Sequence, residues 1–339
     1  MSGSRRDLHK ARLRRDRIRR EKHGQSARQN AADAPRDRAP PFLNAHPFAM
    51  ERSMRSVQAL MEGQPLGSVE EANARLASLT AGGRIVETAN AWKQEDPKWR
   101  AQELAYDAME AEDLSESSRL IDAALKLDPE CVEAQRLRVS LTPAPLAGRI
   151  MLLREVVEKA EQNMGETFIQ EHMGRFWQAI STRPYMRAKQ ELGELLAEAG
   201  DLAGAIAVYE RMLELNPGDN QGVRYPLLGL YLAAGQTEAA GSLLATHQAE
   251  ENLMGSIAWA RVLQLWLSGD LVEAEAALAR ARKVNPFVEE YLRGVRRISE
   301  DGPGYYRPGE VTEAQICARD HAIAWKNHPG FREWVGGLK

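Results

Sequence analysis

Three glycines recur at a nearly constant interval in the second half of the chain, and this spacing most constrains the fold. Gly200, Gly235 and Gly269 lie 35 and 34 residues apart, and each separates two segments with helical periodicity. Pro217 and Pro286 are 69 residues apart, about two such intervals. A repeat of this length holds two helices and a turn, and one helix pair cannot bury its apolar face alone. The spacing therefore predicts a stack of helix pairs.

Residues at fixed offsets within each interval resemble the tetratricopeptide-repeat pattern. The repeat that closes at Pro217 has Gly193, Ala205 and Tyr209 at positions 8, 20 and 24. These positions hold small residues where paired helices touch and a large side chain that fills the gap to the next pair. Repeats closing at Pro129 and Pro286, and one from Gln221 without a closing proline, have further matches: Ala105, Ala124, Tyr231, Ala240, Ala274, Leu278 and Ala281.

Composition favours the same fold class. Apolar residues make up 43% of the chain, Ala, Leu, Glu and Arg are abundant, and long β-branched runs are nearly absent. We therefore expect an all-α protein, a tetratricopeptide-like helical-hairpin repeat superhelix with a disordered basic N-terminal arm.

The pattern divides the chain into five expected segments. They are a disordered Arg-rich arm (1–50), N-terminal helices (51–96), irregular tetratricopeptide-like units (97–183), regular repeats (184–290) and a C-terminal capping segment (291–339). Ser68, followed three residues later by Glu71, has the capping-box pattern of a helix start. Within the irregular units we expect lengthened helices over 147–162 and 165–181.

The arm differs in charge from the rest of the chain. Residues 1–40 hold 13 Lys and Arg against 5 Asp and Glu, a net of +8, which leaves 32 basic and 43 acidic residues, a net of −11. A solvated tail, a nucleic-acid or ribosome contact, an acidic protein partner, the chain's own acidic body and an organelle transit peptide all fit this arm. Its candidate phosphate contacts are Arg12, Arg14, Arg15, Arg17, Arg19 and Arg20.

Other features narrow the function classes. We find no apolar stretch of about 18 residues and no apolar signal core, which argues against membrane insertion and ordinary secretion. Two cysteines, Cys131 and Cys317, suit a reducing compartment, so we expect a cytoplasmic protein. No glycine-rich phosphate loop or nucleophile motif occurs, so we expect no enzyme and no cofactor. Cys317 and His321 have metal-ligand spacing but lack further ligands, and Cys317 is interpreted as an ordinary buried residue.

Partner-binding candidates follow from the offsets that face the inside of a tetratricopeptide superhelix: positions 2, 5, 9 and 12 of each repeat. They place Arg187, Gln190 and Glu194 in the groove. Tyr225, Trp259 and Trp266 would add an aromatic wall, since aromatic side chains make good binding anchors. The alternative is that the two tryptophans pack against the C-terminal helix.

Arg224 beside Tyr225 has two interpretations. It could hold a partner carboxylate by bidentate hydrogen bonds, or form a salt bridge between repeats. Asp219 or Asn220 could cap the helix that follows. A carboxylate clamp for a peptide C-terminus is not expected, because Gln190 and Glu194 stand where that clamp needs Lys and Asn.

Several short blocks resemble a group of bacterial tetratricopeptide proteins that is similar to the suppressor-of-tumorigenicity repeat family. They are residues 101–108, 215–225, 285–292, 306–314 and Trp325. The resemblance covers roughly residues 70–336 and implies a helical repeat scaffold without an established catalytic residue. Pro226 and the stretch 142–145 depart from the pattern.

These observations predict a non-catalytic interaction scaffold that binds a peptide or helix of a protein partner in its groove. The alternative is a nucleic-acid- or ribosome-associated protein that contacts phosphates through the arm.

Overall fold

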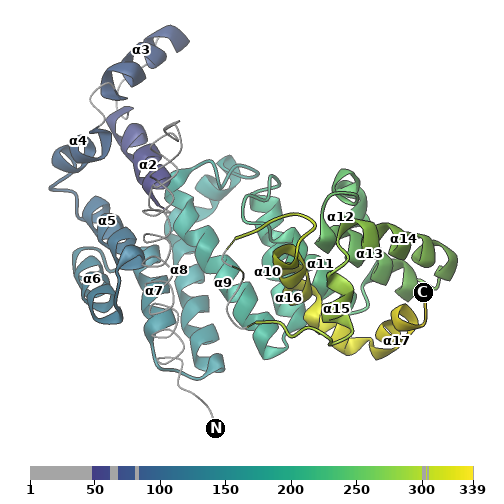
Figure 1. Ribbon diagram of the computed structural model, residues 1–339. Helices are drawn as coiled ribbons and strands as arrows, with labels where there is room; N and C mark the ends of the chain where they lie inside the picture. The colour runs from purple at the N-terminus through teal and green to yellow at the C-terminus, as the bar shows by residue number, and fades with distance from the viewer. Residues whose placement is uncertain (1–47, 62–67, 81–83, 300–302, 304, 339) are drawn as a thin grey trace, which may run out of the picture. The chain divides into compact units, whose positions relative to one another are not determined.

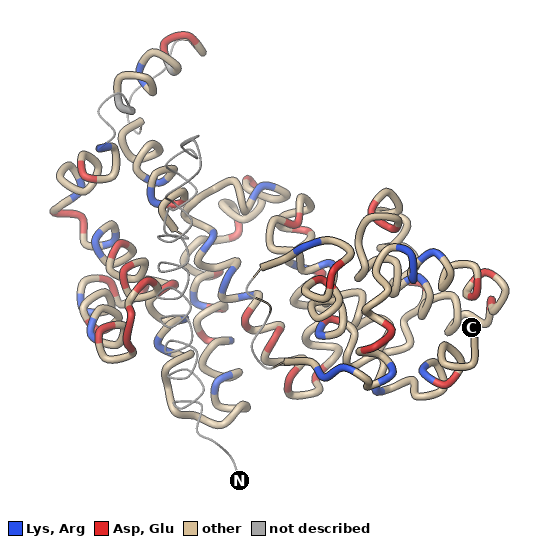
Figure 2. The backbone as a smooth tube through the Cα atoms, in the orientation of Figure 1, with Lys and Arg blue, Asp and Glu red and all other residues tan. Residues whose placement is uncertain are grey.

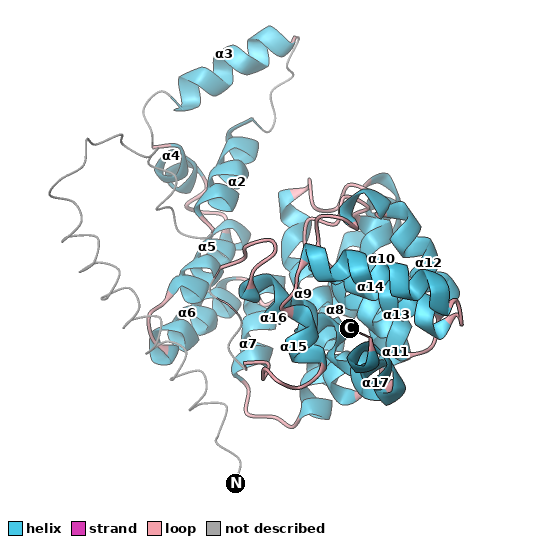
Figure 3. Ribbon diagram, turned by 45° about the vertical axis from the view of Figure 1, so that its right-hand side comes forward, coloured by secondary structure: helices cyan, strands magenta, loops and turns pink. Residues whose placement is uncertain are grey.

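The computed structural model describes residues 48–61, 68–80, 84–299, 303 and 305–338 (Figure 1). Across these ranges the regular elements are helices and there is no strand, which confirms the predicted all-α fold class (Figure 3). The arm arginines predicted to contact phosphates lie outside the described residues. None of the described helices is long and apolar enough to cross a membrane.

The described chain forms two compact units. The N-terminal unit comprises the described residues up to Gly165 together with Gln178–Ala188, and the C-terminal unit comprises Glu166–Trp177 together with the described residues from Lys189 onward. These units group the chain by spatial contacts, whereas the five predicted segments follow repeat boundaries, so that division stays a prediction.

Of the described helices in the N-terminal unit, three precede the repeats: α2 (Ala49–Met61), α3 (Val69–Thr80) and α4 (Ile85–Trp92). Ser68 Oγ accepts a hydrogen bond of 3.1 Å from the N–H of Glu71, so the predicted capping residue does begin α3. A small buried cluster joins α2 to α4 and to the helix that follows; its members are Ala59, Leu60, Ala89 and Trp99.

The first helix pair is α5 (Pro97–Glu110) and α6 (Leu114–Leu127), and α7 (Val132–Leu141) packs against both. Pro97 takes the first helical position of α5, where its missing N–H costs nothing, and the Asp96 carboxylate caps this helix. The small residues predicted at the helix contact, Ala105 and Ala124, are fully buried in one apolar cluster with Ala101, Cys131 and Ala134.

The expected helix over 165–181 forms only in its first part, because residues 166–171 are helical and the helix ends at Glu171. Helix α8 (Leu146–Glu171) is interrupted at Gly165, which has φ 76° and ψ 156°, and turns follow until the short 3-10 helix η2 (Ile180–Thr182). The N–H of Phe176 donates to the carbonyl of Leu215 at 3.1 Å, outside any helix of its own. Gly165 and Gly174 both have positive φ, a conformation that cannot continue a right-handed helix.

Three helix pairs follow: α9 (Arg183–Ala199) with α10 (Leu202–Leu215), α11 (Arg224–Ala233) with α12 (Thr237–Thr246), and α13 (Gly255–Leu267) with α14 (Leu271–Val284). The glycines at the constant interval stand at the turns between the paired helices. Their φ angles are 82° at Gly200, 71° at Gly235 and 82° at Gly269. Each turn repeats one hydrogen bond, from the N–H after the glycine to a carbonyl five residues earlier: Asp201 to Leu196, Gln236 to Tyr231 and Asp270 to Leu265.

Within the α9–α10 pair, Gly193 packs against the ring of Tyr209. A Cβ at Gly193 would stand only 2.5 Å from Cε1 of Tyr209, so the small residue at position 8 and the aromatic residue at position 24 require each other. Both side-chain positions are buried, as the repeat pattern predicts.

The polar entry to α11 is capped by Asp219. Its carboxylate accepts hydrogen bonds from the N–H groups of Val223 at 2.8 Å and Arg224 at 3.1 Å. Pro226 therefore lies in the first turn of α11, where a backbone N–H would have no intrahelical partner. This departure from the repeat pattern is accommodated without breaking the helix.

The C-terminal segment folds into α15 (Val288–Leu292), α16 (Val311–Asn327) and α17 (Pro329–Gly337). Of these, α16 lies along α11 and also contacts α13 and α15 (Figure 1). It buries much of one face, with Glu313, Ala314, Cys317, Ala318, His321, Ala324 and Trp325 removed from solvent. The C-terminal helices thus belong to the core of the C-terminal unit.

Candidate partner-binding surfaces

The inner positions of the α11 and α13 repeats are covered by the chain's own C-terminal helices. Trp259 is fully buried, and its indole N–H donates to the carbonyl of Asn285 at 3.4 Å. Trp266 is partly buried, with its ring edge-on to Phe331 of α17 at 5.6 Å between centroids. Trp259 is thus enclosed and Trp266 packs against α17, and a role for either ring in partner binding stays a prediction.

Backbone contacts show how closely α16 fits this face. The carbonyl of Ser256, at the start of α13, is 2.9 Å from Nε2 of His321. On α11, a Cβ at Gly229 would overlap the backbone of Asp320. Positions 2 and 9 of these repeats therefore touch α16 directly, and a partner segment has no room there.

Arg224 is held within the chain. Its guanidinium pairs with Asp219 at 2.8 Å and Glu250 at 3.1 Å, and it lies over the Tyr225 ring, 4.3 Å from the centroid. The Tyr225 hydroxyl also lies 3.1 Å from Glu250, and burial raises the pKa of this phenol to about 12. Because Asp219 precedes α11 and Glu250 follows α12, the salt-bridge interpretation of Arg224 describes what is seen.

The three candidates on α9 have separate environments. Arg187 is bound on both sides by carboxylates, those of Glu51 at 2.9 Å and of Glu133. Gln190 accepts a hydrogen bond from the side-chain amide of Gln221 at 2.8 Å, and Glu194 is exposed. Arg187 therefore has a structural ion pair of its own, and a role for these three residues in partner binding stays a prediction.

Cys317 and His321 are both buried on α16. Burial lowers the pKa of His321 to about 4, and burial raises that of the Cys317 thiol well above its ordinary value. In the described parts of the chain, no group of three or more His, Cys, Asp or Glu side chains is arranged to hold a metal ion. Cys317 is a buried free thiol, as its interpretation as a core residue requires.

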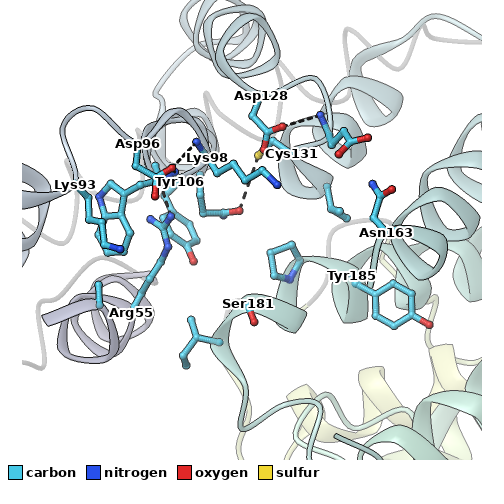
Figure 4. Close-up of a pocket in the computed structure, with 18 of the residues that line it drawn as sticks. Arg55, Lys93, Asp96, Lys98, Tyr106, Asp128, Cys131, Asn163, Ser181 and Tyr185 are labelled. Carbon is cyan, nitrogen blue, oxygen red and sulfur yellow. Dashed lines mark hydrogen bonds between the residues drawn. The ribbon is translucent and has the colours of Figure 1, made fainter. Parts of the chain in front are cut away.

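An open pocket of about 540 Å³ lies in the N-terminal unit (Figure 4). Its walls come from α2, the α4–α5 corner, α5, the α6–α7 turn, α8 and η2 with the first residues of α9. Lys98 of α5 lines it, and so do three side chains further along this helix: Trp99, Gln102 and Tyr106. Counted from Lys98, so that the repeat closes at Pro129, these are positions 2, 5 and 9, the inner-face positions of a tetratricopeptide repeat.

The pocket combines an apolar floor with charged and amide groups at its rim. Arg55 lies flat over Trp99, with its guanidinium carbon 3.7 Å from the ring centroid. Lys98 is exposed beside it, while Asn163 and Ser181 are exposed on the opposite side (Figure 4). Cys131 lines one wall, and burial raises the pKa of its thiol to about 11, so it is no reactive thiolate at neutral pH.

These pocket residues were absent from the predicted site, although a signal for them exists in the sequence. The predicted groove residues come from positions 2, 5, 9 and 12 of the three regular repeats, whereas the repeat that closes at Pro129 belongs to the irregular units. Applied there, the same offsets name Trp99, Gln102 and Tyr106.

Comparison with known proteins agrees with the helix pairs. Two sequence models described as tetratricopeptide repeat match residues 103–141 and 196–265. The first stretch includes most of α5 and all of α6 and α7. The second includes the end of α9, all of α10 to α12 and most of α13. No curated protein matches the chain significantly, and no finding supports the finer similarity to the suppressor-of-tumorigenicity family. With their helix pairs and these two matches, residues 103–141 and 196–265 are tetratricopeptide repeats.

Proposed function

We propose that this protein is a non-catalytic interaction scaffold and that a peptide or helix of a protein partner binds in the pocket of the N-terminal unit. One observation carries the proposal: inner-face positions 2, 5 and 9 of the first repeat line an open pocket. The corresponding positions around Trp259 are covered by α16.

The chemistry of the pocket indicates what it can hold. Trp99 and Tyr106 line the pocket as its apolar side, although they are only 6% and 1% exposed, so they give the pocket shape more than open contact area. The lining carries both signs of charge, Lys93 and Lys98 against Asp96, Asp128 and Glu130, which favours a segment with charged groups of both signs beside an apolar anchor. Most small binding sites combine an apolar lining with a few polar groups in this way.

A single filling substitution tests this assignment. Ser181 is exposed and lines the pocket, so Ser181→Arg places a long side chain in it without removing a core contact. Ser242, exposed on α12, provides the matched control Ser242→Arg. In affinity capture from the source cells with the full chain as bait, we expect Ser181→Arg to lose at least nine-tenths of the partner that wild type and Ser242→Arg recover. Equal recovery by all three baits would contradict the proposal.

Two further points about this protein remain predictions. Binding of nucleic acid or a ribosome through the arm concerns residues outside the described part of the chain. The cytoplasmic location rests on the low cysteine content, and both cysteines are free.

A further inference from the structure

Helix α2 contacts α5 mainly through charged groups. Arg52 is 2.5 Å from Asp107, and it also approaches Glu103 at 3.6 Å and Glu110 at 3.8 Å. One turn further along α2, Arg55 pairs with Glu103 at 2.6 Å. Basic groups of α2 thus face an acidic stripe on α5, defined by Glu103, Asp107 and Glu110 (Figure 2).

In the first turn of α2 the charges are reversed, because an acidic residue of α2 pairs there with arginines of α9. Glu51 accepts a hydrogen bond of 2.7 Å from the hydroxyl of Tyr106 and binds Arg187 at 2.9 Å and Arg183 at 3.3 Å. The cations outweigh the cost of burial and lower the pKa of Glu51, so this carboxylate is charged. Together, these groups of α5 and α9 fit a helix that carries an acidic residue followed by arginines one and four positions later.

Apolar burial holds α2 only weakly. The buried residues of α2 are Glu51, Ser56, Ala59 and Leu60, whereas α16 buries five apolar side chains in addition to Glu313 and His321. The α2 contact also leaves buried atoms without hydrogen-bond partners: Nε of Arg52, Oγ of Ser56 and Oε2 of Glu103. Unmade hydrogen bonds at buried atoms cost free energy, but α16 has two such atoms as well, Thr312 Oγ1 and His321 Nδ1, so the two helices differ in their apolar burial.

We propose that α2 is an exchangeable internal ligand, and that the acidic stripe of α5 takes in its place a partner helix carrying the pattern acid–Arg–x–x–Arg. This deepens the proposed function, on which it rests, by naming the partner's chemistry. When α2 leaves, the pocket loses its Arg55 wall and opens into a groove along α5. Charge complementarity then selects the incoming helix, because the stripe, Tyr106 and Arg187 keep their positions on α5 and α9.

Peptide exchange on the full chain tests the proposal. The probe is a fluorescein-labelled peptide with the sequence of residues 48–61, and its binding is followed by fluorescence anisotropy at low salt, where charge pairing is least screened. The double variant Arg52→Glu with Arg55→Glu releases the internal helix, so we expect it to bind the probe at least tenfold more tightly than wild type. A peptide that carries the same two substitutions should not bind.

The chain offers a matched control. Arg293 and Arg296 are also three residues apart, and they pair with Glu289 and Glu290 in the C-terminal unit. Arg293→Glu with Arg296→Glu should leave probe binding at the wild-type level. Equal probe binding by the α2 variant and wild type, with both folded by circular dichroism, would overturn the proposal.

Hydrogen exchange on the unmodified chain covers the case in which the variant fails to fold. We expect the amides of α2 to exchange at least a hundredfold faster than those of α16, because an exchangeable helix opens without unfolding the repeats. Equal protection of the two helices would make α2 part of the core and overturn the proposal. Failure of peptide exchange leaves the Ser181→Arg result unaffected, so the two proposals fail separately.

Discussion

Gly229 of α11 and Asp320 of α16 are in direct backbone contact, so that a Cβ on Gly229 would overlap the carbonyl oxygen of Asp320 and stand 3.2 Å from Nδ1 of His321. The absence of a side chain at this one position lets α16 lie in the groove of the C-terminal unit. The contact joins residues of two helices that are far apart in the sequence.

Gly229→Ala should therefore destabilise the C-terminal unit. Inserting a methyl group into a packed contact typically costs about 1–3 kcal/mol. Here the methyl group would overlap the backbone of Asp320, which cannot move aside as a flexible side chain can. Urea denaturation followed by tryptophan fluorescence measures the loss. Gly241→Ala is the control, because a Cβ there meets nothing closer than Gln264 at 3.6 Å, and alanine should gain up to about 1 kcal/mol in a helix. A Gly229→Ala protein as stable as wild type would show that α16 does not occupy this groove.

Glu313 is the polar centre that docks the C-terminal segment. Its buried carboxylate accepts hydrogen bonds from the N–H of Gly255 at 2.8 Å, the Asn285 amide at 2.8 Å, the Tyr306 hydroxyl at 2.9 Å and the N–H of Gly309 at 2.7 Å. Glu313→Gln turns an amide NH2 toward some of these donors. Leaving a buried donor unsatisfied costs about 1–3 kcal/mol, so the unfolding midpoint in urea should fall clearly.

Glu310→Gln is the matched control for that change. Glu310 is close to Glu313 on the chain, but its side chain is 45% exposed and pairs only with the exposed Arg307. Its substitution should change stability by less than about 0.5 kcal/mol. Similar losses in the two variants would contradict the central role of Glu313.

Asp320 should make stability depend on pH. Burial raises its pKa from the ordinary 3.8 to about 7. A carboxyl group whose pKa is raised by folding stabilises the folded state fully below about pH 4, and this contribution is lost as the pH rises through 7. Asp320→Asn cannot ionise, so its Tm relative to wild type should rise between pH 4.5 and pH 8, measured by differential scanning fluorimetry. The exposed Asp122→Asn should show no such trend.

Arg187 joins α2 to α7 through Glu51 and Glu133, and all three groups are at most 16% exposed. Arg187→Met leaves both carboxylates without this cation, and removal of one partner of a buried ion pair typically costs about 3–5 kcal/mol. The stability of Arg187→Lys should lie between those of Arg187→Met and wild type, because one ammonium group cannot form the two parallel hydrogen bonds of the guanidinium group. Chemical denaturation checks the order, with the exposed Arg154→Met as control. Equal stability of Arg187→Met and wild type would mean that the ion-pair cluster contributes nothing.

Local pattern accounts for much of what could be predicted. Gly200, Gly235 and Gly269 identified the turns because a helix that ends in a left-handed residue needs glycine there. Ser68 and one of the two candidates, Asp219, are the caps observed, because capping depends on residues only a few positions away. The helix expected over 165–181 ends at Glu171 instead, because apolar spacing alone does not show that Gly174 has a positive φ.

The sequence by itself determined the helix pairs, their turns and the small residues between them, since these depend on contacts within about 34 residues. Only the tertiary structure decided which groove is open. His321 meets Ser256 across 65 residues, and Arg187 meets Glu51 across 136. Periodicity specifies which face of a helix is apolar, but not which distant helix covers it. The Trp259 face was thus closed by α16, and the pocket beside Trp99 stayed open.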